Sequence, residues 1–380
     1  MNRIYLDHAA TTPVHPQVFE KMVPFLQDKF GNPSSIHTFG QTVKLPLEDA
    51  RVFVAKALNT QQSRIIFTSG GTESDIQALI GVALANQEKG KHIIISAIEH
   101  SAVMEATKWL QDFGFEISIL PVSSDGLVSI EQLEAEIRPD TILISILYVN
   151  NELGTIQPIE QIGQLARERG ILFHTDAVQA FPILNIDLSE LPVDLLTISS
   201  HKINGPKGMG ALFLREHIPF KPLFGGSQER SRRGGTENVP AIIGFGEAAK
   251  ILKNNVEDKH VHAELFRELM LNIWKEELGA DSFVTNGHSE KRVPSILNVS
   301  FLGVETQTLI MNLDMNKIAV SGGSACASGA LTVSRILRSL RLEEKIVRSA
   351  IRISFGYGNT EEEIVYAASV IAKIVKQNRK

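Results

Sequence analysis

Short apolar runs alternate with segments of helical period along the first half of the chain. The runs are rich in Ile and Leu and mostly do not alternate with polar residues, which is typical of strands buried on both faces of a parallel sheet. Strands separated by helices predict an α/β layer fold with right-handed crossovers. The expected strands are 64–67, 92–95, 117–120, 142–147, 171–173, 195–198 and 211–214, and the expected helices are 74–87, 102–112, 130–137 and 159–169.

The pattern changes at about Val239. A long helical stretch runs from there toward Leu278, and strand-like runs follow at 296–301 and 351–355 among further helical segments. We therefore expect a smaller α+β domain that the long helix joins to the α/β layer. The basic end of the chain, 373–380, is expected to be a solvated helix tail.

Composition narrows the classes of function. The chain has 380 residues, of which 43% are hydrophobic and 21% charged, so it can bury a large core. A net charge of −5 offers no basic field for nucleic acid. No run is long enough for a membrane span, and Asp7 stands where a signal peptide needs apolar residues, so we expect a cytoplasmic protein. With Cys326 as the single cysteine, we expect no disulfide framework, no structural zinc and no other metal site.

A glycine-containing turn, Ser69-Gly70-Gly71-Thr72-Glu73-Ser74, links an expected strand to an expected helix. Glycines let the backbone approach a ligand, and the first turn of a helix offers N–H groups and a positive dipole end to an anion. The alternative is an ordinary turn capped by Thr72. The spacing matches neither the P-loop nor the dinucleotide-binding pattern, so we do not expect a dinucleotide-dependent oxidoreductase.

Two charged residues follow expected strands. Asp176 comes directly after the run 171–173, and Lys202 comes after 195–198. Open α/β sheets bind ligands at the carboxyl ends of their strands. A buried carboxylate there needs a partner, for which a protonated heterocyclic nitrogen is suitable, and a desolvated lysine can form a Schiff base. The alternatives are a helix cap for Asp176 and an exposed loop for Lys202.

The lone cysteine lies among small residues. Cys326 belongs to the run 321–329, in which its neighbours are serine, glycine and alanine. This composition predicts a mobile loop and therefore an available nucleophile, whereas most free cysteines are buried and inert. His100 follows another expected strand and by itself is a weak candidate for acid–base chemistry or ring stacking.

Together these motifs resemble the class V group of pyridoxal-phosphate enzymes and, within it, the NifS/IscS-type cysteine desulfurases. The likeness extends from about Ile4 to Phe355 and rests most on the lysine and cysteine motifs occurring in one chain in this order. It implies fold-type I, with a mainly parallel seven-stranded sheet in a large domain at 13–258. It also implies a small α+β domain made of 1–12 and 259–380 that carries the cysteine loop, and a homodimer with active sites at the subunit interface.

The resemblance assigns roles residue by residue. Lys202 matches the lysine that binds pyridoxal 5'-phosphate as a Schiff base, and Asp176 matches the acid that keeps the pyridine nitrogen protonated. His100 matches the histidine stacked on the ring, and Cys326 matches the sulfur acceptor. The other matches are Gln179 for the ring hydroxyl, Gly71, Thr72, Ser199 and His201 for the phosphate, Thr236 for a phosphate contact made to the partner subunit, Asn151 for cofactor and substrate, and Arg352 for the substrate carboxylate.

The implied reaction converts L-cysteine to L-alanine and leaves the sulfur on Cys326 as a persulfide. An acceptor protein, either an iron–sulfur scaffold or a tRNA-thiolation enzyme, then takes the sulfur. A selenocysteine lyase, a class V aminotransferase and a nonenzymatic sulfur scaffold are the alternatives. The chain departs from the family pattern at Gly71, where many members have Ala, and at Gly322, where many have Ser. We expect the segment 229–233 to be solvated, with a docking or phosphate-side role as the alternative.

Overall fold

A seven-stranded sheet lies at the centre of the larger part of the molecule. The computed structural model describes residues 3–323 and 334–379, and its main sheet has the strand order β2-β8-β7-β6-β5-β3-β4. β8 pairs antiparallel with β2 and β7, and all other neighbours are parallel. The predicted α/β class and mainly parallel sheet are confirmed. The strands are β2 Ile65–Thr68, β3 His92–Ser96, β4 Glu116–Leu120, β5 Thr141–Ser145, β6 Leu172–Asp176, β7 Leu195–Ser199 and β8 Gly210–Leu214.

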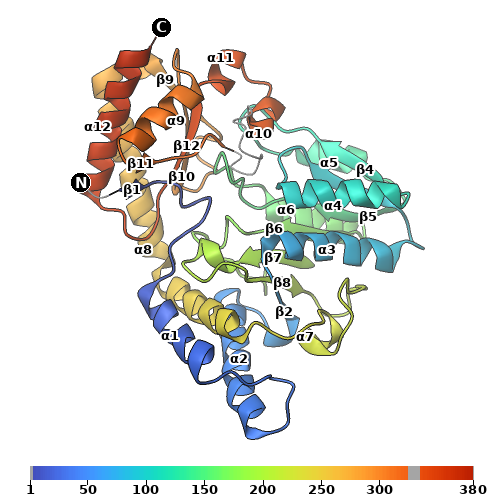
Figure 1. Cartoon of the computed structure of the whole chain (residues 1–380). Coiled ribbons are helices and arrows are strands. Elements are labelled where there is room, and N and C mark those ends of the chain that lie inside the picture. Colours follow the sequence, from blue (N-terminus) through green and yellow to red (C-terminus); the bar gives the residue numbers. More distant parts are fainter. Residues whose placement is uncertain (1–2, 324–333, 380) are drawn as a thin grey trace.

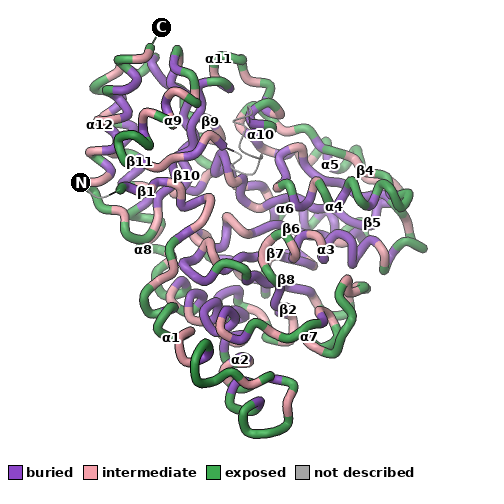
Figure 2. Tube along the Cα trace, viewed as in Figure 1, coloured by how far each residue is buried: buried purple, intermediate pink, exposed green. Residues whose placement is uncertain are grey.

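Helices cover both faces of this sheet (Figure 1). Neighbouring residues of one strand enter different cores: Ile66 packs with α3 and α4, whereas Ile65 and Phe67 pack with α2 and the first half of α8. Figure 2 shows the strands as buried between more exposed helices. The helices of this part are α1 Pro16–Gln27, α2 Thr38–Ala57, α3 Gly71–Asn86, α4 Ser101–Asp112, α5 Ile130–Glu136, α6 Ile159–Glu168 and α7 Gln228–Ser231, with short 3-10 turns η1 Gln62–Arg64 and η2 Ser200–Lys202.

The predicted long helix is α8, Val239–Leu278, and its side chains contribute to two hydrophobic cores. It has 40 residues, which corresponds to a length of roughly 60 Å. Its side chain Leu252 belongs to the core of the large sheet, and Trp274 belongs to a second core. Asn238 caps its start by accepting a hydrogen bond from the Ala241 N–H, and Gly279, with φ of 87°, follows its end.

The second core surrounds a three-stranded antiparallel sheet of order β12-β10-β9. The N-terminal strand β1 joins this part by pairing in parallel with β11. The division into domains at 12/13 and 258/259 stays a prediction. The elements are β1 Ile4–Tyr5, η3 Ala280–Ser282, β9 Phe283–Asn286, β10 Ile296–Phe301, α9 Thr306–Met315, β11 Ile318–Ala319, α10 Arg335–Ser339, α11 Glu344–Val347, β12 Ala350–Ser354 and α12 Glu361–Asn378.

The C-terminal helix differs from its prediction as a solvated tail. α12 continues to Asn378, and Ile374 and Val375 are buried in the second core while Lys373 and Lys376 are exposed. The prediction holds for the helix and for its exposed basic residues. It was wrong for the apolar face, because the lysines are interleaved with apolar residues at helical spacing and the segment is amphipathic. In the described parts of the chain, 3–323 and 334–379, no helix is both long and apolar enough to cross a bilayer.

Candidate active site

The carboxyl ends of three strands meet at one edge of the large sheet. Because β8 runs antiparallel to both β2 and β7, these two strands run in the same direction, and β6 runs parallel to β7. The three strands end at Thr68, Ser199 and Asp176. The turn that begins α3, the turn that carries Lys202 and the carboxylate of Asp176 are therefore brought to the edge where open α/β sheets bind ligands.

A cavity of about 360 Å³ lies beside the turn between β2 and α3. The first turn of α3 provides backbone N–H groups and a positive dipole end, and Lys207 adds a positive charge. The buried hydroxyl of Ser199 has no hydrogen-bond partner among the described residues. These three features together fit a phosphate group. We call this cavity the phosphate cradle; it is lined by Thr11, Ser69, Gly70, Gly71, Thr72, Glu73, Ser199, His201, Lys207 and Gly208.

The departure from the family pattern at Gly71 has a local explanation. A β-carbon at this position would lie 2.9 Å from the Val178 Cγ2 atom, so an alanine requires Val178 to move. Gly71 and Thr72 both line the cradle, and the residue that precedes the helix is Gly70. Thr72 is therefore not the helix cap that the alternative interpretation assigned to it.

Lys202 lies in the short turn that follows β7, where it is half-buried, so it is not the exposed loop residue of the alternative interpretation. Its Nζ donates hydrogen bonds to the backbone carbonyls of Ala9 and Ala10, the second at 2.9 Å. The side-chain amide of Gln179 donates to the same Ala9 carbonyl at 2.8 Å. The N-terminal segment thus holds these two predicted site residues together.

His201 directly precedes Lys202 and lines the cradle. Burial, together with the charges of Lys202 and Lys207, lowers the pKa of His201 to about 4. The ring is therefore neutral near pH 7, and its Nδ1 lies 3.1 Å from the Thr11 hydroxyl. A neutral His201 is a hydrogen-bonding group of the cradle, and the positive charge there comes from the lysines and the helix.

Asp176 and His100 are brought together with a third residue, Asp75. One ligand atom from each of the three lies within 4.8 Å of the other two. Asp176 accepts a hydrogen bond from the Val178 N–H at 2.9 Å, so it caps the following turn as well as facing the site. Burial raises the pKa of Asp176, while His100 and Lys202 act to lower it. The expectation that no metal binds this chain stays a prediction.

Asp75 is a buried acid that the sequence analysis missed. Burial and then the Asp176 carboxylate raise the pKa of Asp75 well above its ordinary value. Its Oδ1 lies 3.7 Å from His174 Nε2, but burial lowers the pKa of His174 to about 3, so this contact is not an ion pair. Burial and the neighbouring Asp176 carboxylate therefore both favour the protonated form of Asp75. No local signal distinguished Asp75, because residues 72–74 already make the start of α3 polar.

Arg352 and Asn151 come from different parts of the chain and are in contact. Arg352 lies on β12, is buried, and donates to the Asn151 carbonyl at 2.9 Å and to the Asp7 carboxylate at 2.7 Å. Its Nε is buried and has no partner among the described residues. An arginine with a remaining donor suits a substrate carboxylate. The pairing with Asp7 was not predicted, because nothing in the local sequence links residues 7 and 352.

Two predicted site residues are not placed with the others. Cys326 lies outside the described residues. Thr236 is described and exposed, but it is absent from the residues that line the cradle of its own chain.

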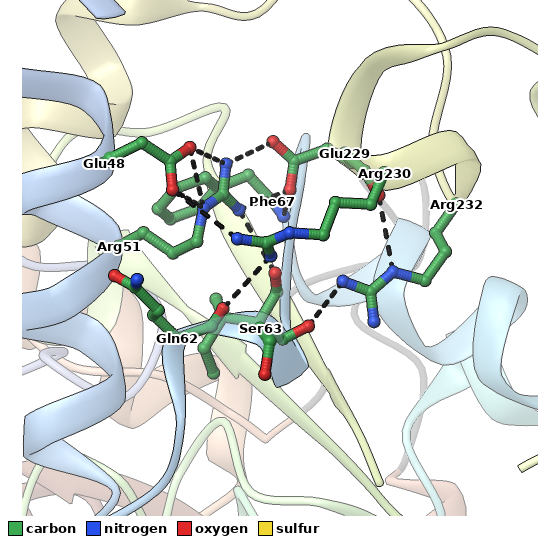
Figure 3. Close-up of polar contacts among 9 residues, drawn as sticks. Glu48, Arg51, Gln62, Ser63, Phe67, Glu229, Arg230 and Arg232 are labelled. Atoms are coloured by element: carbon green, nitrogen blue, oxygen red, sulfur yellow. Dashed lines mark hydrogen bonds and ion pairs between the residues drawn. The ribbon is translucent and has the colours of Figure 1, made fainter. Parts of the chain in front are cut away.

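The segment 229–233 differs in part from its expectation as solvated. Arg230 and Ser231 are exposed. Glu229 is buried, Arg232 is partly buried and hydrogen-bonded (Figure 3), and so is Arg233. The prediction was wrong for Glu229, Arg232 and Arg233, because their hydrogen-bond partners lie far away in the sequence.

Comparisons with known proteins agree with this arrangement. The family model Aminotransferase class-V matches residues 4–366. The cysteine desulfurase IscS of Methanosarcina thermophila is 44% identical over 99% of this chain and 93% of its own. A solved NifS-like protein superposes with a TM-score of 0.92 at 36% identity, over 99% of this chain and 100% of that one. A structure described as SspA in complex with cysteine has a TM-score of 0.81 at 36% identity, over 93% and 98%.

Proposed function

The chain belongs to the aminotransferase class-V family, and from this premise we propose that it is a pyridoxal-phosphate-dependent cysteine desulfurase. It converts L-cysteine to L-alanine and transfers the sulfur to the thiol of Cys326. The observation that carries the proposal is the meeting of Lys202, Asp176 and the phosphate cradle at one edge of the sheet. A relative named as a cysteine desulfurase that is 44% identical over 99% of this chain supports it.

The described residues fit pyridoxal phosphate. The start of α3, Lys207 and the unpartnered Ser199 hydroxyl would hold its phosphate. Asp176 would hold the ring nitrogen in its protonated form, which gives this buried carboxylate the positively charged partner it needs. His100 would lie against the ring. When bound, the cofactor supplies an electron sink for the bonds broken at the substrate α-carbon.

The substrate is oriented by Arg352. Its guanidinium binds the carboxylate of L-cysteine, and the unpartnered Nε provides a further donor for that bond. Asn151, whose carbonyl already holds Arg352, lies beside it and completes the binding group. The amino acid is thereby held by its carboxylate, with its thiol left for the sulfur transfer.

Lys202 and His100 move protons. Lys202 Nζ would hold the cofactor, and its amine would move a proton at the substrate α-carbon. His100 Nδ1 accepts a hydrogen bond from the Ala102 N–H at 3.2 Å, so its Nε2 carries the proton of the neutral ring. That N–H would donate a hydrogen bond to the substrate sulfur, and the ring would give a proton there only when both of its nitrogens are protonated.

The sulfur moves to Cys326. The thiolate of Cys326 attacks the substrate sulfur, the carbon–sulfur bond of the substrate breaks, and a sulfur–sulfur bond forms on the enzyme. The carbon left behind gains a proton, and L-alanine is released. An enzyme persulfide and one L-alanine therefore form from each L-cysteine.

Mass spectrometry of the purified enzyme after incubation with L-cysteine tests the function directly. We expect Cys326 to gain one sulfur atom while L-alanine appears in equal amount. Lys202→Ala should lose both products and the visible absorption of the bound cofactor. Cys326→Ser should keep that absorption and form neither persulfide nor L-alanine. Lys253→Ala, which removes an exposed lysine of α8, is the matched control and should behave as wild type.

Each alternative function predicts a different experimental outcome. Faster turnover of selenocysteine than of cysteine would indicate a selenocysteine lyase. Amino-group transfer without L-alanine formation would indicate an aminotransferase, and purified protein that binds no cofactor would indicate a sulfur scaffold. Sustained sulfide release by Cys326→Ser would contradict the role given to Cys326.

We further propose that the enzyme acts as a homodimer. Several large apolar side chains are exposed on α1, α2 and the loop between them, and groups of this kind commonly mark protein interfaces. We propose that a second copy of the chain covers this surface. Thr236 does not line the cradle of its own chain and would complete the cradle of the partner chain. The patch comprises Phe19, Leu26, Phe30, Ile36, Phe39 and Leu45.

The sulfur acceptor is proposed to be a protein. An iron–sulfur scaffold and a tRNA-thiolation enzyme both accept persulfide sulfur, and incubation of persulfidated enzyme with each would show which takes it. We propose a cytoplasmic location, because the activity requires Cys326 as a free thiol and this compartment keeps thiols reduced.

A further inference from the structure

Three consecutive non-glycine residues have left-handed backbone conformations. Glu229, Arg230 and Ser231 have φ angles of 47°, 56° and 61°. A β-carbon makes this region unfavourable, so three such residues in sequence persist only where the surrounding structure holds them. They form the short turn α7, directly before Arg232 and the glycine pair at 234–235. Strain of this kind often marks a segment whose position has a function.

A buried ion pair holds this turn (Figure 3). The carboxylate of Glu229 accepts hydrogen bonds from Arg51 Nη1 at 2.5 Å and Nη2 at 2.8 Å, and from the Phe67 N–H at 2.8 Å. The two charged side chains are only 4% and 3% exposed, and the guanidinium stacks 4.6 Å from the Phe67 ring centre. Because the Glu229 carboxylate without Arg51 would be a buried charge with no paired cation, the ion pair ties the turn to α2 and β2.

The arginines that follow fix the next part of the segment. Arg232 Nη2 donates to the Ser63 carbonyl at 2.6 Å (Figure 3). Arg233 donates to both oxygens of Glu73, at 2.9 Å and 3.2 Å, and Glu73 lines the phosphate cradle. The segment is therefore attached at the rim of the cradle, while Thr236 beyond it is exposed.

We propose that Glu229 and Arg51 are positioning residues for the cofactor site of the partner subunit. Their ion pair holds the strained turn so that the loop 233–236 presents Thr236 to the phosphate bound in the partner's cradle. This inference rests on the proposed function and its dimer. It assigns the segment 229–233 a phosphate-side role that acts across the subunit interface.

Cofactor binding by the apoenzyme tests the proposal. In the double variant Arg51→Met with Glu229→Gln, the glutamine oxygen still accepts from Phe67 and no charge is left unpaired, so the fold should persist. We expect its affinity for pyridoxal phosphate to fall about tenfold, as for the loss of a charged hydrogen bond. Its affinity for pyridoxal, which lacks the phosphate, should not change.

Glu48→Gln is the matched control. Glu48 pairs with the same Arg51 at 3.2 Å, but its side chain is 38% exposed. An exposed pair contributes little, so this variant should bind both compounds as wild type does. Equal losses for pyridoxal phosphate and pyridoxal in the double variant would show a general disturbance of the site and overturn the proposal.

Mixed dimers show in which subunit the pair acts. In the first, one chain carries the double change Arg51→Met with Glu229→Gln and the other carries Lys202→Ala; in the second, one chain carries all three changes and the other is wild type. Each mixed dimer has one intact Lys202, on which borohydride traps bound cofactor. We expect wild-type labelling of Lys202 at limiting cofactor in the first dimer and weaker labelling in the second.

The reverse labelling pattern would place the effect within one chain and contradict the proposal. Failure of the proposed function is a separate result, because it would appear as wild-type enzyme that binds cofactor but forms no L-alanine from L-cysteine. The mixed dimers therefore test whether the partner subunit contributes to cofactor binding, independently of which reaction the enzyme catalyses.

Discussion

Glu99 shows how burial controls single side chains around the site. It is fully buried, and its Oε1 accepts hydrogen bonds from the Leu147 N–H at 3.0 Å and the Ser96 hydroxyl at 2.5 Å. Burial nevertheless raises the pKa of Glu99 to about 8, because the two hydrogen bonds offset only part of the desolvation. Glu99 is therefore mostly protonated at pH 7, and burial together with the Asp176 carboxylate favours the protonated form of Asp75 as well.

Glu99→Gln should change the pH dependence of stability. The pKa of Glu99 rises from an ordinary 4.5 to about 8 on folding, so between these values the folded chain keeps a proton that the unfolded chain has lost. The free energy of unfolding therefore falls as pH rises through this window. Glutamine cannot ionise, so the variant should gain roughly 3 kcal/mol relative to wild type between pH 5 and pH 8. Urea unfolding at several pH values measures this.

Glu88→Gln, at an exposed position after α3, is the control for Glu99→Gln and should follow the wild-type curve. Parallel curves for Glu99→Gln and wild type over the whole window would mean that Glu99 is already ionised in the folded protein.

At the scale of elements, the close approach of β8 to the cradle turn decides the shape of the phosphate site. A β-carbon at Gly210 on β8 would lie 2.6 Å from the Gly70 carbonyl carbon. This contact involves backbone on both sides, so no side-chain rotation can relieve it. The glycine at 210 is therefore needed for the sheet and the start of α3 to come together.

Gly210→Ala should push the cradle turn away from β8. We expect a loss of about 1–3 kcal/mol in stability, as for other overpacked sites, and weaker binding of pyridoxal phosphate. Thermal unfolding and a cofactor titration measure the two effects. Gly225→Ala is the matched control, because a β-carbon there meets nothing within 4 Å; it should change stability by no more than about 0.5 kcal/mol. A Gly210→Ala protein with wild-type cofactor affinity would contradict this account.

At the scale of the whole molecule, the apolar patch on α1, α2 and their loop is the surface proposed to bind a second chain. Ile36 is 90% exposed, and Phe30 and Phe39 stack with ring centres 5.6 Å apart at the surface. Exposure of these apolar side chains to water is unfavourable in free energy, and burying them in a dimer interface removes that exposure. The same association would bring Thr236 of each chain to the cradle of the other.

Replacing Ile36 and Phe39 together by Asp should weaken the dimer, because each change places a charge in an apolar interface. We expect the equilibrium to shift at least tenfold toward monomer, and pyridoxal phosphate affinity to fall with it. Sedimentation measures the first effect and a titration the second. Met315→Asp, at an 81% exposed position on α9, should leave both unchanged. A variant that still sediments as a wild-type dimer would exclude this surface.

Local sequence patterns were sufficient for the large sheet and for the long helix α8. Helices α1 and α2 were not predicted, because each contains a proline, Pro24 or Pro46, within the helix, and proline normally indicates a break. Both helices nevertheless form, because their packing against α8 outweighs the free-energy cost of the proline within each helix. The tail of α12 was misjudged for a related reason: charge alone suggested solvent, but the second core buries its apolar face.

The sequence by itself determined the order of strands and helices along the chain and the residue types placed at strand ends, including Lys202 and Asp176. Only the tertiary structure decided which charges share a desolvated site, as when Glu229 pairs with Arg51, 178 residues away. Periodicity predicts elements because it depends on near neighbours in the chain. Burial, which sets the pKa of Asp75 and gives the Arg51–Glu229 pair its strength, depends on segments that come together only when the chain folds.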